Sequence, residues 1–475
     1  MTSQGSRQRV IPRPSERRQR VSQIEADLAI ISEPPPEVVR SAGSSKSSSS
    51  WLFVALGVFG ILASGTGFGF LGLTQRQETT VGLALIPIVG LVAFSGIRRW
   101  VTPKHGEWFG AVIFAGFGIR ALAAVPRLMG GADAPIYQAT GRQIALALRQ
   151  FNFTVDTGRA IPGTGSIRYL SGIVNVFTGS SYLGTFMVFV AIGFVGQVVF
   201  LIGVKSTLNP RQFRLLTLFM MFSPTLAFWP SSIGKESVVL FGTGLIVLGS
   251  SRLYDRSWSG VPYVLVGVFA VGMVRPHVAM VILAAMLVGL LARRARTRGR
   301  ALSHLVVLVV VIVGSMWAAN ASANLFGLES LDGLADLSAA LDFAQDRTSQ
   351  DDSRFVASRV ESPRDFPMAL ITVLFRPFPW EAVGPMALLS SIEGLAMLAL
   401  VLRSTPGALV KFGGILERGQ LLMAVTYISV FVFIFSAIGN FGILSRQRAQ
   451  VVPFVLLLVA FGIGLDEKRR SARTT

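Results

Sequence analysis

Residues 181–204 read SYLGTFMVFVAIGFVGQVVFLIGV, a run without a single charged side chain. At 1.5 Å per residue such a run forms a helix of roughly 36 Å, which is longer than the roughly 30 Å of hydrocarbon in a bilayer. Its apolar residues are continuous and do not alternate with polar ones, so a strand of a β-barrel is excluded. The run therefore predicts a membrane-spanning helix.

Similar apolar runs recur from Trp51 to the C-terminal region, so we expect an all-α polytopic membrane protein with about twelve transmembrane helices. The composition agrees, with 51% hydrophobic and only 15% charged residues. A helical chain also satisfies its own backbone hydrogen bonds in lipid. The expected spans are 51–73, 81–97, 107–125, 181–204, 212–229, 233–250, 261–274, 277–292, 302–320, 384–402, 420–438 and 449–465.

Basic residues in the short loops predict the orientation, because cytoplasmic loops carry an excess of lysine and arginine. With the N-terminal tail inside, every expected inside loop is basic, and both termini lie in the cytoplasm of an inner (plasma) membrane protein. This topology accounts for the net charge of +19, so no nucleic-acid partner is expected. The basic residues of the inside loops are Arg98, Arg99, Lys104, Lys205, Arg211, Arg214, Arg252, Arg256, Arg293, Arg294, Arg296, Arg298, Arg300, Arg403, Lys411 and Arg418.

The chain divides into three parts. Residues 1–50 contain clustered arginines, a proline run and a serine run but no apolar core, so they predict a disordered basic cytoplasmic tail that contacts membrane lipids rather than a signal peptide. Residues 51–465 form the multi-pass domain, with two long extracytoplasmic segments at about 126–180 and 321–383. Residues 466–475 are a second basic cytoplasmic tail.

Residues 261–292 are expected to form a hairpin of two short helices, broken at Arg275-Pro276-His277. A single span would place the basic run 293–300 outside, whereas the hairpin keeps that run inside. Short or broken helices are tolerated where they line a cavity within the protein.

No cofactor is expected. The chain has no cysteine, and none of its three histidines is paired at ligand spacing. Asp351-Asp352, in the acidic first part of the segment 321–383, could bind a divalent cation. A solvated acidic loop is the favoured interpretation of that pair.

Six segments that this topology places at the outer face carry charged side chains. Lys235 is the only one of the six lysines expected outside, and a basic residue close to the hydrocarbon costs roughly 2.5–3.5 kcal/mol. An anionic ligand would offset that cost, since each charge-assisted hydrogen bond contributes roughly 1.5–3 kcal/mol. Taken singly, each residue is explained as an interfacial anchor or a local ion pair, but their gathering at one face favours a shared site. The candidates are Asp133, Tyr137, Arg168, Tyr169, Lys235, Glu236, Arg275, His277, Arg376, Glu381, Arg446 and Arg448.

A phosphate or pyrophosphate attached to a long polyprenol would carry its charge at this depth. The five cations Lys235, Arg275, Arg376, Arg446 and Arg448 would bind that headgroup and stabilise the departing lipid phosphate. Asp133 is the candidate catalytic residue, a general base for an acceptor hydroxyl. Glu236 and Glu381 are the alternative acids, and the tyrosines would stack on the sugar or hydrogen-bond to it.

Several of these motifs together resemble the type-C integral-membrane glycosyltransferases and membrane proteins of bacterial polysaccharide gene clusters. The resemblance covers residues 107–460. It implies a polyprenyl-phosphate-linked sugar as donor, a cell-envelope glycan or lipid as acceptor, and Asp133 as base. The chain departs from the family in having two extra spans before Asp133 and no second acidic residue beside it. The motifs are Asp133 with Tyr137, Tyr169-Leu-Ser-Gly172, Phe177-Thr-Gly-Ser180, Ser223-Pro with Phe228-Trp229 and Gly234-Lys-Glu236, Arg376-Pro-Phe-Pro-Trp-Glu381, and Arg446-Gln-Arg448.

Two other functions remain open. An O-antigen-type polysaccharide polymerase would also need external arginines around a pyrophosphate, but it would lengthen a chain instead of adding one sugar. A transporter or a non-catalytic subunit of an envelope complex is the third interpretation. A transporter is expected to carry charged or polar residues near the bilayer centre. The expected spans are nearly bare of them, with Gln197 and Glu393 the clearest exceptions, which disfavours a transporter.

Overall fold

The computed structural model describes residues 48–72, 78–130, 133–179, 181–291, 308–309, 312–316, 342, 345, 354–410 and 412–471. The regular structure of these residues is helical, as expected, with one isolated antiparallel bridge between Arg354 and Asn440. The N-terminal tail up to residue 47, most of the expected span 302–320 and the pair Asp351-Asp352 lie outside the described residues.

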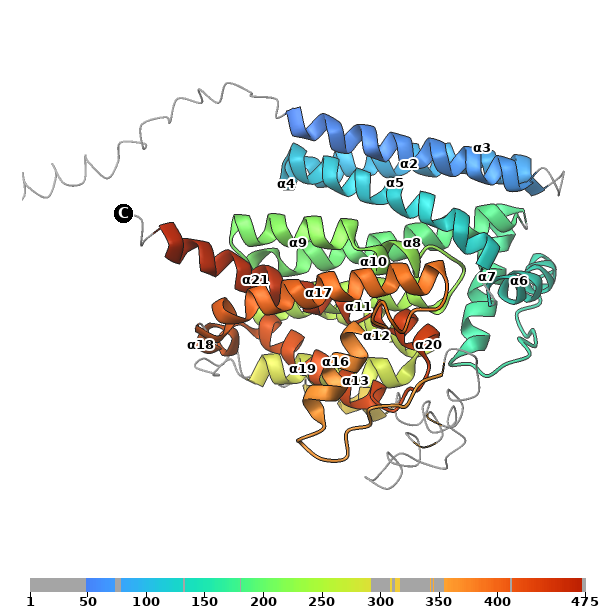
Figure 1. Ribbon diagram of the computed structural model, residues 1–475. Coiled ribbons are helices and arrows are strands. Elements are labelled where there is room, and N and C mark those ends of the chain that lie inside the picture. Colours follow the sequence, from blue (N-terminus) through green and yellow to red (C-terminus); the bar gives the residue numbers. More distant parts are fainter. Residues whose placement is uncertain are drawn as a thin grey trace, which may run out of the picture. The chain divides into compact units, whose positions relative to one another are not determined.

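The helices lie where the sequence contains apolar runs (Figure 1). Every expected span overlaps helical residues, which in the span 302–320 are residues 308–309 and 312–316, and the last helix continues into the expected C-terminal tail as far as Ser471. The helices are α2 Ser48–Gly72, α3 Glu78–Gly96, α4 Thr102–His105, α5 Glu107–Gly130, α6 Ala134–Arg149, α7 Thr164–Thr178, α8 Tyr182–Val204, α9 Pro210–Phe222, α10 Pro224–Phe228, α11 Lys235–Tyr254, α12 Val261–Val274, α13 Pro276–Leu291, α16 Phe366–Phe375, α17 Pro385–Val410, α18 Phe412–Leu416, α19 Gly419–Phe435, α20 Phe441–Arg448 and α21 Val452–Ser471.

Four described helices are long and apolar enough to cross a bilayer: Glu107–Leu128, Tyr182–Thr207, Lys235–Tyr254 and Pro385–Ala408. Phe441–Arg448 and Val452–Ile463 meet the same requirement together, across a bend of 59°. Shorter apolar helices accompany them, including the expected pair on either side of Arg275. These helices indicate a multi-pass membrane protein, while the number of twelve spans stays a prediction.

Glycines let α8 and α11 pack backbone against backbone. A Cβ added to Gly196 would collide with the backbone of Phe241, and one added to Gly203 would lie 2.8 Å from the amide nitrogen of Leu248. Close approach at small residues is a common basis of helix association in membranes, where dispersion and not water exclusion is the driving force. The contact farther along α8 is also the one farther along α11, so the two helices run parallel.

The same kind of contact joins α11 to α12 in the opposite sense. Gly242 meets Gly267, while Gly249, farther along α11, meets Gly260 at the start of α12. The two helices are therefore antiparallel. Consequently the beginnings of α8 and α11 and the end of α12 lie at the same end of the helices.

Since α8 and α11 are parallel, the residues between them must return the chain to the end where α8 begins. They do so as two helices, so the expected single span 212–229 is a broken helix. Proline at position 224 has no amide hydrogen and disfavours helical geometry at the residue before it, and Ser223 has φ −65° and ψ 122°. Ser223 then caps α10 by accepting a hydrogen bond from the amide of Leu226 at 3.3 Å.

A buried arginine stabilises the carboxyl end of α9 at this break. The guanidinium of Arg120, in α5, donates to the carbonyl oxygens of Met220 and Met221 at 2.9 and 3.0 Å and also contacts the side-chain amide oxygen of Gln197. A cation at a helix carboxyl end is favoured by the helix dipole. The sequence analysis singled out Gln197 but missed Arg120, which lies within an expected span.

A carboxylate stabilises the amino end of α10 in the complementary way. Glu393, in α17, accepts hydrogen bonds from the amide of Thr225 at 2.9 Å and from the hydroxyl of Ser223 at 2.8 Å. An anion at a helix amino end is likewise favoured. The two polar residues expected within spans, Gln197 and Glu393, thus both serve this broken helix.

The long segments expected outside contain helices of their own. Residues 126–180 include α6 and α7, which lie at the end of the bundle where α5 ends and α8 begins (Figure 1). Residues 321–383 include α16, which packs against α19 and α17. These helices hold several of the candidate residues in defined positions.

We expect Gly196→Ala to destabilise the protein by about 1–3 kcal/mol, because its Cβ would overlap the backbone of α11. Gly65→Ala in α2 is the matched control: a Cβ there meets nothing within 4 Å, and alanine favours helix by about 1 kcal/mol. Thermal unfolding of the detergent-solubilised protein measures both. Equal shifts for the two variants would contradict the packing of α8 on α11.

Candidate functional site

Four segments far apart in the chain bring charged side chains into contact. Arg446 lies at the centre: its Nη1 is 2.5 Å from Oδ2 of Asp133, and its Nε is 2.7 Å from Oε1 of Glu236. Nη2 of Arg275 is 2.5 Å from the same oxygen of Glu236. Asp133, Glu236, Arg275 and Arg446 are called the charge cluster below.

Local structure explains how each member reaches the cluster. Asp133 directly precedes α6, and Glu236 lies in the first turn of α11, where the helix dipole favours an anion. Arg275 is the residue at which α12 stops and the expected hairpin turns. Arg446 belongs to the short helix α20, whose first turn Asn440 caps by accepting from the amide of Ile443 at 3.0 Å.

The cluster is buried at its core and open at one side. The side chain of Glu236 is 2% exposed and that of Arg275 is 6%, whereas Arg446 is 23% and Asp133 is 43% exposed. Burying a carboxylate costs several kcal/mol unless it is paired and hydrogen-bonded, and Glu236 is paired with two guanidinium groups. Glu236 therefore holds two arginines in place, while Asp133 lies on the exposed side of the charge cluster.

More cations than anions meet here. Lys235 donates to the hydroxyl of Thr164 at 2.9 Å and lies within electrostatic reach of all four cluster residues. Arg127 is within reach of three of them. Two carboxylates (Asp133, Glu236) against four cations (Arg127, Lys235, Arg275, Arg446) leave a formal charge of +2. Such an excess favours an anionic ligand.

Tyr137 lies on the buried face of α6, one turn beyond Asp133. Burial, and then the neighbouring Asp133 carboxylate, raise the pKa of its phenol. The hydroxyl therefore stays protonated at neutral pH, as a hydrogen-bond donor beside the cluster would need to be.

Arg127 was missed by the sequence analysis. Its Nη2 donates to the hydroxyl of Ser232 at 3.0 Å, and its guanidinium carbon lies 5.1 Å from the ring centroids of both Phe228 and Trp229. The sequence did indicate Arg127, because it is a basic residue just beyond the expected outer end of the span 107–125. Lys235 was singled out on the same ground.

Arg127 also lines a cavity of about 230 Å³ between α10 and α17. The walls are mostly apolar and aromatic, and Glu393 is a further polar side chain there. A second cavity, of about 280 Å³, shares Pro224 and Glu393 with the first and continues between α9, α17 and α21. Arg127, which lies within electrostatic reach of the charge cluster, thus also lines an apolar space.

Arg376, Glu381 and Arg448 form a separate network. Nε of Arg376 lies 3.0 Å from both carboxylate oxygens of Glu381, and this hydrogen-bonded guanidinium holds the pKa of Glu381 below its usual value. The same guanidinium lies over the rings of Phe355 and Phe441, at 4.8 and 5.2 Å. Arg448 is 1% exposed and donates to the carbonyl oxygen of Arg376, so it fixes the backbone beside α20.

The remaining candidates have other surroundings. Arg168 donates to the carbonyl oxygen of Thr157 at 2.7 Å, which ties α7 to the loop before it. Tyr169 is half-buried on α7, and His277 is half-buried in the first turn of α13 beside Arg275. That these three residues bind substrate stays a prediction.

Among the three candidate bases, exposure and pairing favour Asp133. Both oxygens of Glu236 accept from Arg446, and the side chain is nearly inaccessible. Both oxygens of Glu381 accept from Arg376, and one also accepts from the amide of Phe378 at 2.9 Å. Asp133 is the most exposed carboxylate in the charge cluster.

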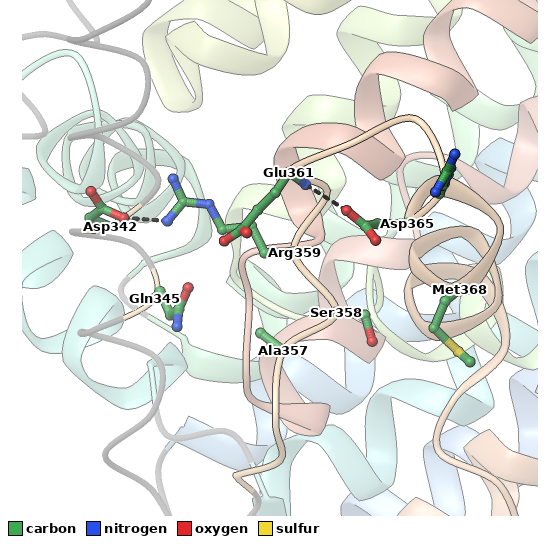
Figure 2. A pocket seen from close by; sticks show the side chains of 9 residues that line it. Asp342, Gln345, Ala357, Ser358, Arg359, Glu361, Asp365 and Met368 are labelled. Carbon is green, nitrogen blue, oxygen red and sulfur yellow. Dashed lines mark hydrogen bonds and ion pairs between the residues drawn. The ribbon is translucent and has the colours of Figure 1, made fainter.

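A solvent-facing pocket of about 680 Å³ lies elsewhere, along residues 357–368 (Figure 2). Figure 2 shows Arg359 directed at Asp342, and the backbone of Glu361 at the carboxylate of Asp365. Arg359 thus pairs with Asp342, and Asp365 accepts from the backbone amides of Glu361 and Ser362. In the part of the chain that the structure describes, no three histidine, aspartate or glutamate residues come together as a metal site.

We expect Glu236→Gln to lower stability by about 3–5 kcal/mol, because two buried guanidinium groups would lose their shared anion. Glu381→Gln, which removes the partly exposed partner of Arg376, serves as the control and should cost less. Unfolding of both variants in mixed micelles gives the comparison. A Glu236→Gln loss no larger than that of the control would show that Glu236 does not hold the cluster together.

The comparisons with known proteins add no assignment to this geometry: no family model, no curated protein and no solved structure matches the chain. The resemblance to type-C glycosyltransferases therefore rests on the motif residues alone. Any function has to be argued from the charge cluster and its surroundings.

Proposed function

We propose that the protein is a membrane glycosyltransferase, which transfers a sugar from a polyprenyl-phosphate-linked donor to a glycan or lipid acceptor at the outer face of the inner membrane. The observation that carries the proposal is the exposed carboxylate of Asp133 in the charge cluster, with the further cations Lys235 and Arg127 within electrostatic reach. Arg127 also lines a cavity with mostly apolar walls. A lipid-linked sugar has the matching parts, namely an anionic phosphate, a polar sugar and an apolar chain.

The phosphate would bind between Arg446 and Lys235 on one side and Arg127 on the other. Arg446 is held by Glu236, and Arg127 by Ser232 and two aromatic rings, so these donors are oriented before a ligand arrives. Preorganised donors stabilise charge that develops in a transition state without reorganising during the reaction. The apolar cavity next to Arg127 would take the first units of the polyprenol chain.

In the proposed reaction, the acceptor hydroxyl attacks the anomeric carbon of the sugar. A bond forms between this oxygen and the anomeric carbon, and the bond from that carbon to the phosphate oxygen breaks. The electron pair of the broken bond goes to the polyprenyl phosphate, whose charge the arginines stabilise. Asp133 takes the proton of the acceptor hydroxyl, a role that contributes roughly 10²–10⁴ to the rate.

The transporter interpretation also has one observation in its favour. The helix broken between α9 and α10, with Arg120 and Glu393 at its two ends, resembles the discontinuous helices of secondary transporters. Both charges are bonded to helix ends, however, and Glu393 accepts from the backbone amide of α10. They are accounted for by the fold, so transfer chemistry at the charge cluster is the favoured function.

We expect Asp133→Asn to lower transfer by roughly 10²-fold or more, since an amide cannot accept the proton. The assay reconstitutes the protein with a polyprenyl-phosphate sugar and measures released polyprenyl phosphate and the size of the product. Asp156→Asn is the matched control, because Asp156 is an exposed acid in the same segment that only accepts from the amide of Gly158.

Near-normal turnover by Asp133→Asn would remove this residue from the mechanism. Products lengthened by whole repeat units would favour a polymerase. Movement of the intact donor across the bilayer without released phosphate would favour a transporter and contradict the proposal.

A further inference from the structure

The polarity of α7 is reversed relative to a helix on a water-soluble surface. Its protein-facing side carries mostly small and polar residues, among them Ser171 and Asn175, beside the apolar Ile167 and Val174, whereas its outward side carries apolar residues at helical spacing. Phe177 is 84% and Ile173 is 39% exposed, and Leu170 and Val176 are half-buried on the same side. Helices that face lipid show this arrangement.

The polar side of α7 is satisfied within the protein. The side-chain amides of Asn175 and Gln138 exchange hydrogen bonds at 2.8 and 3.2 Å, which joins α7 to α6. The hydroxyl of Thr185, in α8, donates to Asn175 at 3.2 Å. The orientation of α7 is therefore held from inside, and the apolar side is directed outward by the fold.

The chain itself places this apolar side at the membrane. α7 ends at Thr178, and the candidate span of α8 begins at Tyr182. Phe177 thus lies within a few residues of the point at which the chain becomes a membrane-spanning helix. The end of α7 therefore lies close to the level at which α8 enters the membrane.

The end of α6 adds a second exposed aromatic group. The guanidinium of Arg149 donates to the carbonyl oxygens of Asn175 and Val176, both at 3.2 Å, which brings the end of α6 to the end of α7. Two residues later Phe151 adopts a left-handed conformation, with φ 58°, and its side chain is 83% exposed. This conformation belongs to the end of α6, where the amides of Phe151 and Asn152 donate to the carbonyl oxygens of Leu148 and Ala147, both at 3.0 Å. The fold therefore holds the exposed ring of Phe151 near the end of α7.

From these observations we infer that the apolar side of α7, with Phe151, is an interfacial membrane anchor that inserts into the lipid leaflet next to the charge cluster. The inserted side chains are Ile173, Val176 and Phe177 together with Phe151. The anchor sets the depth of α6 in the membrane, and therefore the depth of Asp133, which directly precedes α6. The inference concerns a lipid surface and holds whether or not Asp133 is a catalytic residue.

The chain permits a direct test because it contains no cysteine. Single variants Ile173→Cys and Phe177→Cys would be spin-labelled in the full-length protein in lipid nanodiscs. Phe177 is almost fully exposed, so labelling it removes little packing, and Ile173 lies on the same exposed side of α7. Arg159→Cys, at an exposed polar position of the connection between α6 and α7, is the matched control. Collision rates with oxygen, which concentrates in lipid, and with a water-soluble nickel chelate report the surroundings of each label.

We expect oxygen to be the dominant collision partner at positions 173 and 177 and the nickel chelate to dominate at position 159. Nickel dominance at 173 and 177 would place α7 in water and overturn the inference. Labels shielded from both reagents would show that a protein, a second copy of the chain included, covers this side, and would overturn it equally. The transfer assay of the Asp133 variant is independent of either outcome.

Discussion

The buried carboxylate of Glu236 is the constraint on which the rest of this arrangement depends. It accepts from Arg275 and Arg446 and so joins three separate segments, namely the start of α11, the turn between α12 and α13, and α20. Without it, the buried guanidinium of Arg275 would lose its ion-pair partner and Arg446 would keep only Asp133, and an uncompensated buried charge is among the most costly defects that a protein interior can contain. Arg446 then reaches outward to Asp133, so that a structural ion pair also orients the exposed carboxylate of the candidate site.

Close glycine contacts and a broken helix make this meeting geometrically feasible. Parallel packing of α8 on α11 places Lys235 and Glu236 at the end where α8 begins, and antiparallel packing of α12 brings Arg275 to the same end. The break at Ser223-Pro224 lets Phe228, Trp229 and Ser232 turn toward Arg127, and Arg120 and Glu393 satisfy the helix ends that the break exposes. Arg120 and Glu393, two charges within the expected spans, thus stabilise the fold and position the candidate site without belonging to it.

Much of this could be predicted from the sequence. Continuous apolar runs predicted the helices, and the basic run after residue 292 predicted the hairpin at Arg275, because both signals are local. The contact of Arg446 with Asp133 joins residues 313 positions apart, and no local pattern encodes it. Arg120 was missed because hydropathy averaged over a span hides one charge that is bonded to backbone carbonyls. Arg376 and Glu381 are of the same residue types as the members of the charge cluster, but they pair with each other. Only three-dimensional contacts reveal that they do not belong to the cluster.

The most direct measurement of the central claim is a double-mutant cycle on Glu236 and Arg446. Glu236→Gln, Arg446→Gln and the double variant would be unfolded in mixed micelles beside the unmodified protein. The account predicts a coupling free energy of about 1–3 kcal/mol, because the second substitution removes a group that the first has already left without its partner. Losses that add to within about 0.5 kcal/mol would show that the two side chains do not interact, and would contradict the account.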